Sequence, residues 1–342
     1  MEQVAAVLNA GYMKPGKFEG PQSKPMPDVL FIKTSSLGDV IHHMPALTEA
    51  RARRPDTRFS WAVEEAFAPL VGLHPAVERA IPVAARRWRG ALTQSSTWQE
   101  IAHFRRAMRE RRFDQVIDTQ GLFKSALIGR AAKGRHHGYD PNSVKEPLAC
   151  ALYRVRHTGA WNQHAIARNR ALTGLVLGYT PEGPPDFGLD RKSLAEPSGA
   201  PYGVLLHATA RADKEWPEAN WRMLAAALGT GVDLVVPFGT EAERERSTRI
   251  AAATPRARVP DRAPLDGVAR LIAGASFVVG VDTGLLHLAA GLGVPLVAMF
   301  SASEPGLTGP MGSGPIHVLG GKGAPPSVGE VAETAALLRE QG

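Results

Sequence analysis

This chain of 342 residues contains a single cysteine, and it lacks the sequence signatures of several common ligand sites. The single thiol, Cys150, excludes an internal disulfide framework and fits a reducing compartment. Cysteine and histidine show no spacing typical of a metal site. Neither a complete G-x-G-x-x-G nor a Walker A sequence is present, which disfavours a standard dinucleotide or P-loop site.

Long apolar runs are also scarce. Residues 1–27 hold no run long enough for a secretory signal and contain several prolines and glycines, so we expect a flexible leader. Residues 283–303 carry no charge and approach the length of a membrane span. However, Gly291, Gly293 and Pro295 divide that stretch into a short helix and a strand, and we expect no membrane-spanning helix there.

Acidic side chains are few in one part of the chain. The net charge is +7, but residues 86–170 alone hold 17 basic and 6 acidic side chains. Such a basic segment indicates an anionic partner, which could be nucleic acid, an anionic membrane face or an acidic substrate. The segment has no recognised nucleic-acid-binding module, so nucleic acid is the disfavoured partner.

The length of the chain predicts two domains. In each half, short apolar segments alternate with helix-like patterns, which predicts an α/β fold with parallel, doubly wound sheets. The predicted parts are a leader (1–27), a first domain (28–185), a linker (186–201), a second domain (202–326) and a last helix (327–342). The predicted strands are 29–32, 58–63, 77–83, 113–118, 202–207, 232–237, 276–282 and 294–300. Helices are expected at 41–53, 98–112 and 125–132, and from residues 216, 241, 283 and 327.

Polar side chains follow the predicted strands of the first half. Asp39 comes after the first strand, Glu64 after the second, and Asp118 and Gln120 at the end of the fourth. In open α/β sheets, ligands bind beyond the carboxyl ends of the strands. A carboxylate placed there can serve as a general base, although aspartate is equally common as a helix cap. Asp39 is the strongest of these candidates, and both interpretations stay open.

Two further segments suit the binding of anions. Residues 86–89 place three arginines beside a tryptophan in a stretch without a regular pattern, which fits carboxylate or phosphate recognition or a solvated basic loop. Asp282, Thr283 and Gly284 join a buried strand to a helix. Backbone N–H groups at such a helix start attract anions, Thr283 adds a hydroxyl, and His287, one turn further on, is a candidate cation. Simple helix capping is the alternative.

Taken together, these segments resemble the lipopolysaccharide heptosyltransferases that use ADP-heptose, and most closely those that add the first heptose to Kdo. The resemblance runs from residue 29 to the end of the sequence, and the order and spacing of its motifs make it specific. The matching segments are 33–40 (KTSSLGDV), 61–65 (WAVEE), 86–89 (RRWR), 118–122 (DTQGL), 207–209 (HAT), 213–217 (DKEWP), 281–285 (VDTGL), 287–288 (HL) and 305–307 (PGL).

The resemblance implies a GT-B fold, in which two Rossmann-like domains face each other across a cleft and the last helix crosses back to the first domain. It implies an inverting transfer of L-glycero-D-manno-heptose from ADP-heptose to the Kdo of Kdo-lipid A, without a cofactor or metal ion. It implies catalytic roles for Asp39, as general base, and Lys214. The implied donor-binding residues are Thr209, Lys214, Glu243, Asp282, Thr283, Gly284 and His287. The implied acceptor-binding residues are Lys33, Ser35, Ser36, Arg86, Arg89 and Gln120.

The same resemblance implies a cytoplasmic protein bound peripherally to the anionic inner face of the inner membrane. We expect a basic helix face to hold the protein there, unless that face is merely solvated. The arginines concerned are Arg105, Arg106, Arg109, Arg111 and Arg112. The sequence departs from the family at Ala210, where a second threonine is common, and at Gly90, where a lysine is common. The alternatives are a heptosyltransferase of the second type, another GT-B enzyme such as a nucleotide-sugar epimerase, and a basic nucleic-acid-binding protein.

Overall fold

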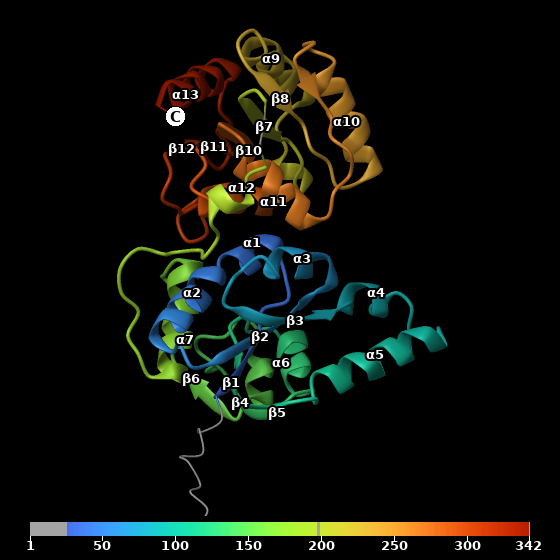
Figure 1. Cartoon of the computed structure of the whole chain (residues 1–342), viewed down its shortest axis with the longest axis vertical. Coiled ribbons are helices and arrows are strands. Elements are labelled where there is room, and N and C mark those ends of the chain that lie inside the picture. Colours follow the sequence, from blue (N-terminus) through green and yellow to red (C-terminus); the bar gives the residue numbers. More distant parts are fainter. Residues whose placement is uncertain (1–25, 197–198, 342) are drawn as a thin grey trace, which may run out of the picture.

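A computed structural model describes residues 26–196 and 199–341, which form two six-stranded sheets, one above the other in Figure 1. All pairings between the named strands are parallel, as predicted. The first sheet contains β1 (Asp28–Ile32), β2 (Arg58–Glu64), β3 (Val77–Val83), β4 (Arg112–Asp118), β5 (Lys133–Tyr139) and β6 (Val155–His157). The second contains β7 (Tyr202–Leu206), β8 (Asp233–Val235), β9 (Ala257–Arg258), β10 (Phe277–Val281), β11 (Leu296–Phe300) and β12 (Ile316–Gly320).

The two sheets have the same strand order. It is β3-β2-β1-β4-β5-β6 in the first sheet and β12-β11-β10-β7-β8-β9 in the second. The order therefore reverses between β1 and β4 in one domain and between β7 and β10 in the other. In a doubly wound sheet this reversal opens a crevice at the carboxyl ends of the two strands, where ligands bind. Each domain thus offers one such position.

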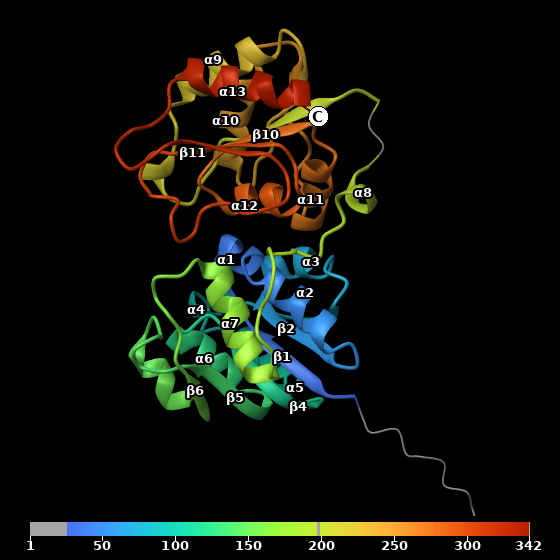
Figure 2. The same cartoon turned by 90° about the vertical axis from the view of Figure 1, so that its left-hand side faces the viewer.

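Helices connect the strands and cover the sheets (Figure 2). Those of the first domain are α1 (Leu37–Ile41), α2 (Met44–Arg53), η1 (Glu65–Phe67), α3 (Ala68–Val71), α4 (Ala85–Arg89), α5 (Ser95–Ala107), α6 (Phe123–Gly129), η2 (Pro147–Leu152) and α7 (Ala165–Leu177). The others are α8 (Arg191–Leu194), η3 (Ala212–Lys214), α9 (Glu218–Leu228), α10 (Glu241–Ala251), α11 (Leu265–Ala273), α12 (Gly284–Gly291) and α13 (Val328–Gln341). β1, β10 and β11 are buried along their whole length, as expected for central strands covered on both faces.

Several predicted elements in the first half need correction. The helix predicted at 41–53 begins earlier, as α1, and restarts as α2, because Pro45 has no N–H to donate to the carbonyl of Ile41. Residues 85–89 form the short helix α4 rather than an irregular stretch. β5, β6 and α7 were not predicted. β5 escaped detection because its sequence, KGRHHGY, is polar and rich in glycine.

The last helix packs on the second domain. α13 contacts α9 and the strands β10, β11 and β12. Its buried side chains Val331, Ala335 and Leu338 belong to the same apolar cluster as Trp216 and Trp221. The expectation that this helix packs back toward the first domain is therefore wrong for the part of the chain that the structure describes. Its start is as predicted, because Ser327 and Glu330 form a capping box.

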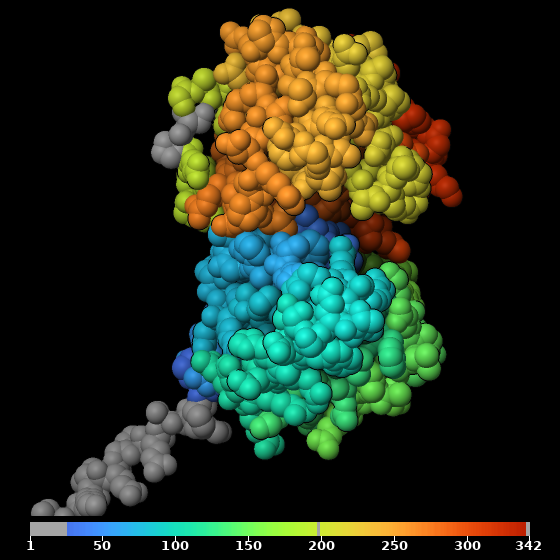
Figure 3. All heavy atoms as spheres, turned by 90° about the vertical axis from the view of Figure 1, so that its right-hand side faces the viewer, coloured from blue at the N-terminus to red at the C-terminus, as the bar shows by residue number. Residues whose placement is uncertain are grey.

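The segment predicted as a linker is packed against both domains. Arg191, at the start of α8, donates to the carbonyls of Ala273 and Ala275 in the second domain. A Cβ on Gly188 would collide with His74 of the first domain. α1 also contacts α12, at the junction where Figure 3 shows the two lobes packed against each other. The two domains therefore share a contact surface as well as a connecting segment.

No helix of the described residues is long and apolar enough to cross a membrane. Residues 283–303 form α12 and β11 with their connecting turns, in agreement with the sequence interpretation. The predicted leader lies outside the described residues, except for residues 26 and 27.

Candidate active site

Asp39 lies at the carboxyl end of β1, in the first turn of α1. Its Oδ2 accepts hydrogen bonds from the backbone N–H and the hydroxyl of Ser36, at 2.9 and 3.0 Å. The ammonium of Lys33 lies 4.0 Å from Oδ1. The Asp39 side chain is 46 % exposed, so it caps the helix while still facing solvent. The two interpretations of this aspartate, cap and functional carboxylate, are compatible.

The surroundings of Asp39 keep it ionised. Burial raises the pKa of this carboxyl, but the Lys33 ammonium and the hydrogen bonds from Ser36 outweigh burial, and the net pKa lies below its usual value. Lys33 is deeply buried, and desolvation lowers its pKa although Asp39 and Asp118 oppose that shift. Asp39 is therefore a charged carboxylate near neutral pH, with a cation beside it that stabilises that charge.

A cavity of about 450 Å³ opens next to Asp39. Three cationic side chains line it, from Lys33, Lys145 and Arg168. The guanidinium of Arg168 lies 4.1 Å from the ring centre of Trp161, which also lines the cavity. Three cations around one carboxylate suit a ligand that carries negative charge and a group able to give up a proton.

Gln120 joins the turn after β4 to the turn after β1 at the base of the cavity. Its side-chain oxygen accepts from the N–H of Thr34, at 2.7 Å, and its amide nitrogen donates to the carbonyl of Ser35, at 2.7 Å. The buried Asp118 fixes the turn that carries Gln120 by accepting from its backbone N–H. The ammonium of Lys124 reaches the Ser35 hydroxyl, at 3.0 Å. The predicted residues Lys33, Ser35, Ser36, Asp39 and Gln120 therefore meet in one place.

Arg86 and Arg89 are not part of that cluster. They lie on α4, are exposed, and are absent from the described lining of the cavity. The backbone N–H of Arg86 donates to Glu64, which anchors α4 near the end of β2. Arg87, between them, is held by Glu65 and Glu100. A ligand that also contacts Arg86 or Arg89 would have to extend out of the cavity.

In the second domain, Asp282 is the centre of a polar cluster at the end of β10. Its Oδ2 accepts from the ammonium of Lys214, at 2.5 Å, and from the hydroxyl of Ser303, at 2.6 Å. Thr209 donates to the Asp282 carbonyl, at 2.9 Å. Burial raises the pKa of Asp282, but the bonds from Lys214 and Ser303 bring it below the usual value. Asp282 thus positions Lys214, with Thr209 beside them.

The start of α12 follows directly. Thr283 is its N-cap, yet the threonine side chain makes no capping hydrogen bond, so simple capping does not explain this residue. A Cβ on Gly284 would lie 2.6 Å from the side chain of Leu37 on α1. The absence of a side chain at Gly284 therefore lets the two domains approach each other here, besides leaving the backbone N–H groups accessible.

His287 links the two domains. Its Nδ1 lies 3.2 Å from Nε2 of His42, at the end of α1, and its ring packs against Gly38. Burial lowers the pKa of His287 to about 4, against opposing effects of Asp282 and Asp39. The pKa of His42 is also lowered, by burial first and by His287 second. His287 is therefore a neutral hydrogen-bonding group near neutral pH rather than the cation expected from the sequence.

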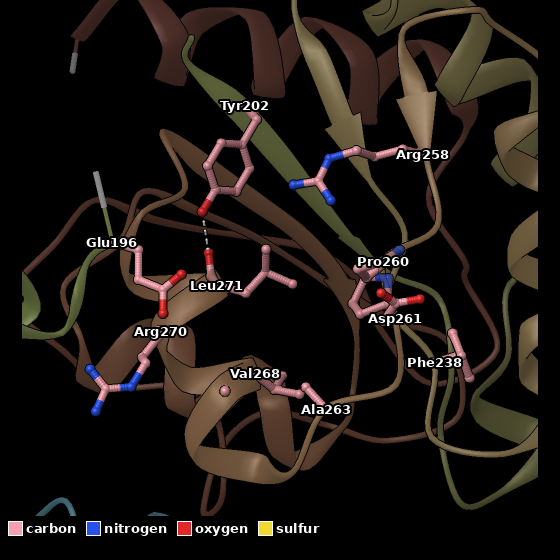
Figure 4. A pocket seen from close by; sticks show the side chains of 12 residues that line it. Glu196, Tyr202, Phe238, Arg258, Pro260, Asp261, Ala263, Val268, Arg270 and Leu271 are labelled. Carbon is pink, nitrogen blue, oxygen red and sulfur yellow. Dashed lines mark hydrogen bonds between the residues drawn. The ribbon is translucent and has the colours of Figure 1, made fainter. Parts of the chain in front are cut away.

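Glu243 occupies a separate position. It forms a capping box with Thr240 at the start of α10, and its carboxylate accepts from the N–H groups of Gly239 and Thr240. A second cavity, of about 450 Å³, lies near this turn (Figure 4). Among the described residues, Phe238 lines it and none of the predicted site residues does. We therefore place the candidate site at the Asp39 cavity.

Sequence reasoning missed several of these residues. Lys124 could have been found from the sequence. A lysine in the first turn of a helix is unfavourable beside the helix dipole, which suggests that it binds a ligand or another side chain. Ser303 follows a predicted strand end and could have been included on that ground. No sequence pattern points to Lys145, Arg168 or His42, since only the folding of the chain brings them to the site.

The comparisons with known proteins agree with this geometry. A family model described as glycosyltransferase family 9 (heptosyltransferase) matches residues 101–335. The lipopolysaccharide heptosyltransferase 1 of Pseudomonas aeruginosa is 48 % identical over 294 residues, which cover 85 % of this chain and 83 % of that protein. The enzyme of the same name from Escherichia coli K12 is 45 % identical over 289 residues, or 83 % and 91 % of the two chains. Lipopolysaccharide heptosyltransferase 2 of that strain is 26 % identical over 310 residues, or 83 % and 85 %.

A solved structure of the E. coli heptosyltransferase WaaC with ADP superposes with a TM-score of 0.85 at 40 % identity. It covers 91 % of this chain and 99 % of WaaC. The same enzyme with ADP-2-deoxy-2-fluoro heptose gives a TM-score of 0.82, over 92 % and 99 % of the two chains. The chain therefore belongs to glycosyltransferase family 9, the heptosyltransferases, and is a glycosyltransferase of lipopolysaccharide core synthesis.

Proposed function

We propose that this enzyme transfers L-glycero-D-manno-heptose from ADP-heptose to the Kdo of Kdo-lipid A, with inversion at the anomeric carbon. The observation that carries the proposal is the Asp39 cavity, in which an ionised carboxylate stands among cations next to the second domain's Asp282–His287 segment. The similarity to enzymes named heptosyltransferase 1, at 45–48 % identity, favours this acceptor over that of the second type, at 26 %.

Asp39 would act as the general base. The Kdo hydroxyl attacks the anomeric carbon of heptose, the bond from that carbon to the diphosphate oxygen breaks, and the hydroxyl proton passes to Asp39. A single displacement of this kind inverts the configuration. The lowered pKa of Asp39 ensures that the carboxylate is free to take the proton at neutral pH.

The second domain would bind the donor. Departing ADP gains negative charge, so Lys214 and the backbone N–H groups at the start of α12 contribute most in the transition state. Thr209, Asp282 and Thr283 would hold the diphosphate and sugar, and His287 would contact them as a neutral hydrogen-bonding group. Glu243 would reach the nucleoside end by exchanging one of its two backbone N–H partners for a ribose hydroxyl.

The two domains would close on the substrates in the manner of a GT-B enzyme. The two crevices, at β1/β4 and at β7/β10, would face each other across a cleft, since α1 and α12 meet between them. The anionic acceptor would occupy the cavity with Lys33, Lys145 and Arg168, and would extend toward Arg86 and Arg89 on α4. A cytoplasmic enzyme at the inner face of the inner membrane would meet both substrates.

Product formation tests the proposal. The enzyme is incubated with ADP-heptose and Kdo-lipid A, and mass spectrometry should find the acceptor heavier by one heptose, with or without a chelator. The matched reaction supplies an acceptor that already carries the first heptose. Transfer to that acceptor alone would assign the enzyme to the second type and refute the proposed acceptor.

A further inference from the structure

Three exposed apolar side chains lie near one another beside the Asp39 cavity. Phe123 and Leu127 are 45 % and 57 % exposed and lie four residues apart, on one face of α6. Leu148, in η2, is 74 % exposed. α6 packs against η2, and the backbone N–H of Phe123 donates to Glu146, two residues before Leu148. We call these three side chains the α6–η2 patch.

The patch continues from the rim of the cavity. Leu122 lines the cavity directly before Phe123, and Lys145 lines it three residues before Leu148. Figures 1 and 2 place α6 on the first domain, away from the junction with the second domain. A ligand that enters the cavity across this rim therefore passes along exposed apolar surface.

Cations surround the patch. Lys124 on α6, Arg130 directly after α6 and Lys145 at the cavity are exposed, although Lys124 also donates to the Ser35 hydroxyl. The nearby acid Glu146 is engaged by the N–H of Phe123. Apolar side chains that stand among lysines and arginines are typical of surfaces that rest in the headgroup region of an anionic bilayer.

The arginines at and beyond the end of α5, which the sequence suggested for this purpose, are less suitable. Arg111 is paired with Glu78 and lies near Asp28, and Arg109 donates to the carbonyl of Ala131. Part of the positive charge there is therefore already neutralised or held by hydrogen bonds within the protein.

We propose that the α6–η2 patch docks on an anionic phospholipid surface, with Phe123, Leu127 and Leu148 inserted below the headgroups. This inference rests on the proposed function, since a lipid-anchored acceptor must present its sugar to the cavity while its acyl chains stay in the bilayer. If the protein docks at this rim, the Kdo can enter the cavity beside Lys145 while the acyl chains of the acceptor stay in the membrane.

Co-sedimentation with vesicles that contain phosphatidylglycerol tests the docking. The variant Phe123→Ser/Leu127→Gln/Leu148→Gln should lower the partition coefficient by about 30-fold, because burial of apolar side chains drives interfacial binding. The control Met223→Gln/Val318→Thr/Leu337→Gln changes three exposed apolar side chains of the second domain and should bind as the unaltered enzyme does. If the triple variant does not fold, Leu148→Gln alone should still lower the partition coefficient severalfold.

Turnover separates this inference from the proposed function. The α6–η2 variant should lose activity on vesicle-embedded Kdo-lipid A but keep it, within about twofold, on a deacylated, water-soluble acceptor. Unchanged sedimentation, or equal binding to phosphatidylcholine vesicles, would overturn the docking proposal. So would a dimer that the substitutions dissociate, since the patch would then cover a second copy of the chain. Failure of the unaltered enzyme on both acceptors would instead refute the proposed function.

Discussion

The crevices of the two domains occupy the same topological position and carry different chemistry. At β1/β4, Asp39 is half exposed and stands at the edge of a cavity among cations. At β7/β10, Asp282 is engaged by Lys214 and Ser303. The same residue type at the end of a central strand therefore serves as a candidate base in one domain and as an anchor for a cation in the other. The exposure of the carboxylate, rather than topology, distinguishes the two, because the side chain is 46 % exposed in Asp39 and 15 % exposed in Asp282.

The largest expected effect is on turnover when Asp39 is changed. Asp39→Asn keeps the size of the side chain and removes its ability to take a proton, so kcat should fall by about 10²- to 10⁴-fold. Steady-state assays with both substrates in excess measure this. Asp56→Asn, at an exposed position of the same domain, is the control and should be neutral. Turnover within tenfold of the unaltered enzyme would remove Asp39 from the role.

Lys214→Ala should have the next largest effect. The substitution removes the cation that Asp282 holds and leaves the developing charge on ADP without it, so kcat should fall by about 10²-fold. Single-turnover rates at saturating ADP-heptose report this loss separately from donor binding. Lys192→Ala, on the exposed face of α8, provides the comparison. An unaltered chemical rate would show that Lys214 only helps to bind the donor.

A smaller effect is expected from the contact that joins the two crevices. His42→Ala removes the partner of His287 across the domain junction, which should lower kcat/KM by about tenfold because the two halves are aligned less well. His103→Ala, an exposed histidine on α5, is the matched control. The melting temperature of each variant should be measured by calorimetry alongside the kinetics. A fall in stability without a fall in kcat/KM would make His42 a packing residue only.

The smallest effect concerns pH. The Lys33 ammonium lowers the pKa of Asp39, so activity is retained in acid until the pH falls through that lowered value. Lys33→Met removes this stabilisation of the carboxylate, so its pKa rises and the acid limb of kcat/KM should move up by about one pH unit. A pH–rate profile measures the shift. An acid limb that stays in place would mean that another group controls it.

Sequence reasoning predicted the parts of the site that lie in local motifs. Asp39 follows a buried strand, and Asp282 to Gly284 join a strand to a helix, so periodicity alone placed them at sheet edges. The pairing of Lys214 with Asp282 joins two such strand ends, at β7 and β10, which are neighbours in the sheet. These features follow from the repeating βα pattern and from the resemblance to the family.

The remainder depends on long-range packing. The contact of His42 with His287 joins residues 245 positions apart, and no local pattern encodes it. Lys145 and Arg168 belong to segments whose strands and helices were not recognised, because β5 is polar and rich in glycine and β6 has only three residues. The last helix was misplaced because the resemblance to the family implied the first domain, while its own apolar stripe shows that it packs but not on which domain.

Binding of ADP to two variants, measured side by side by calorimetry, tests the central claim that the crevices divide base and donor binding between them. Asp39→Asn should bind ADP with a Kd within about twofold of the unaltered enzyme, whereas Lys214→Ala should bind it at least about tenfold more weakly, since only the second variant loses a charge-assisted contact to the diphosphate. Equal losses in both variants, or a loss confined to Asp39→Asn, would contradict the division.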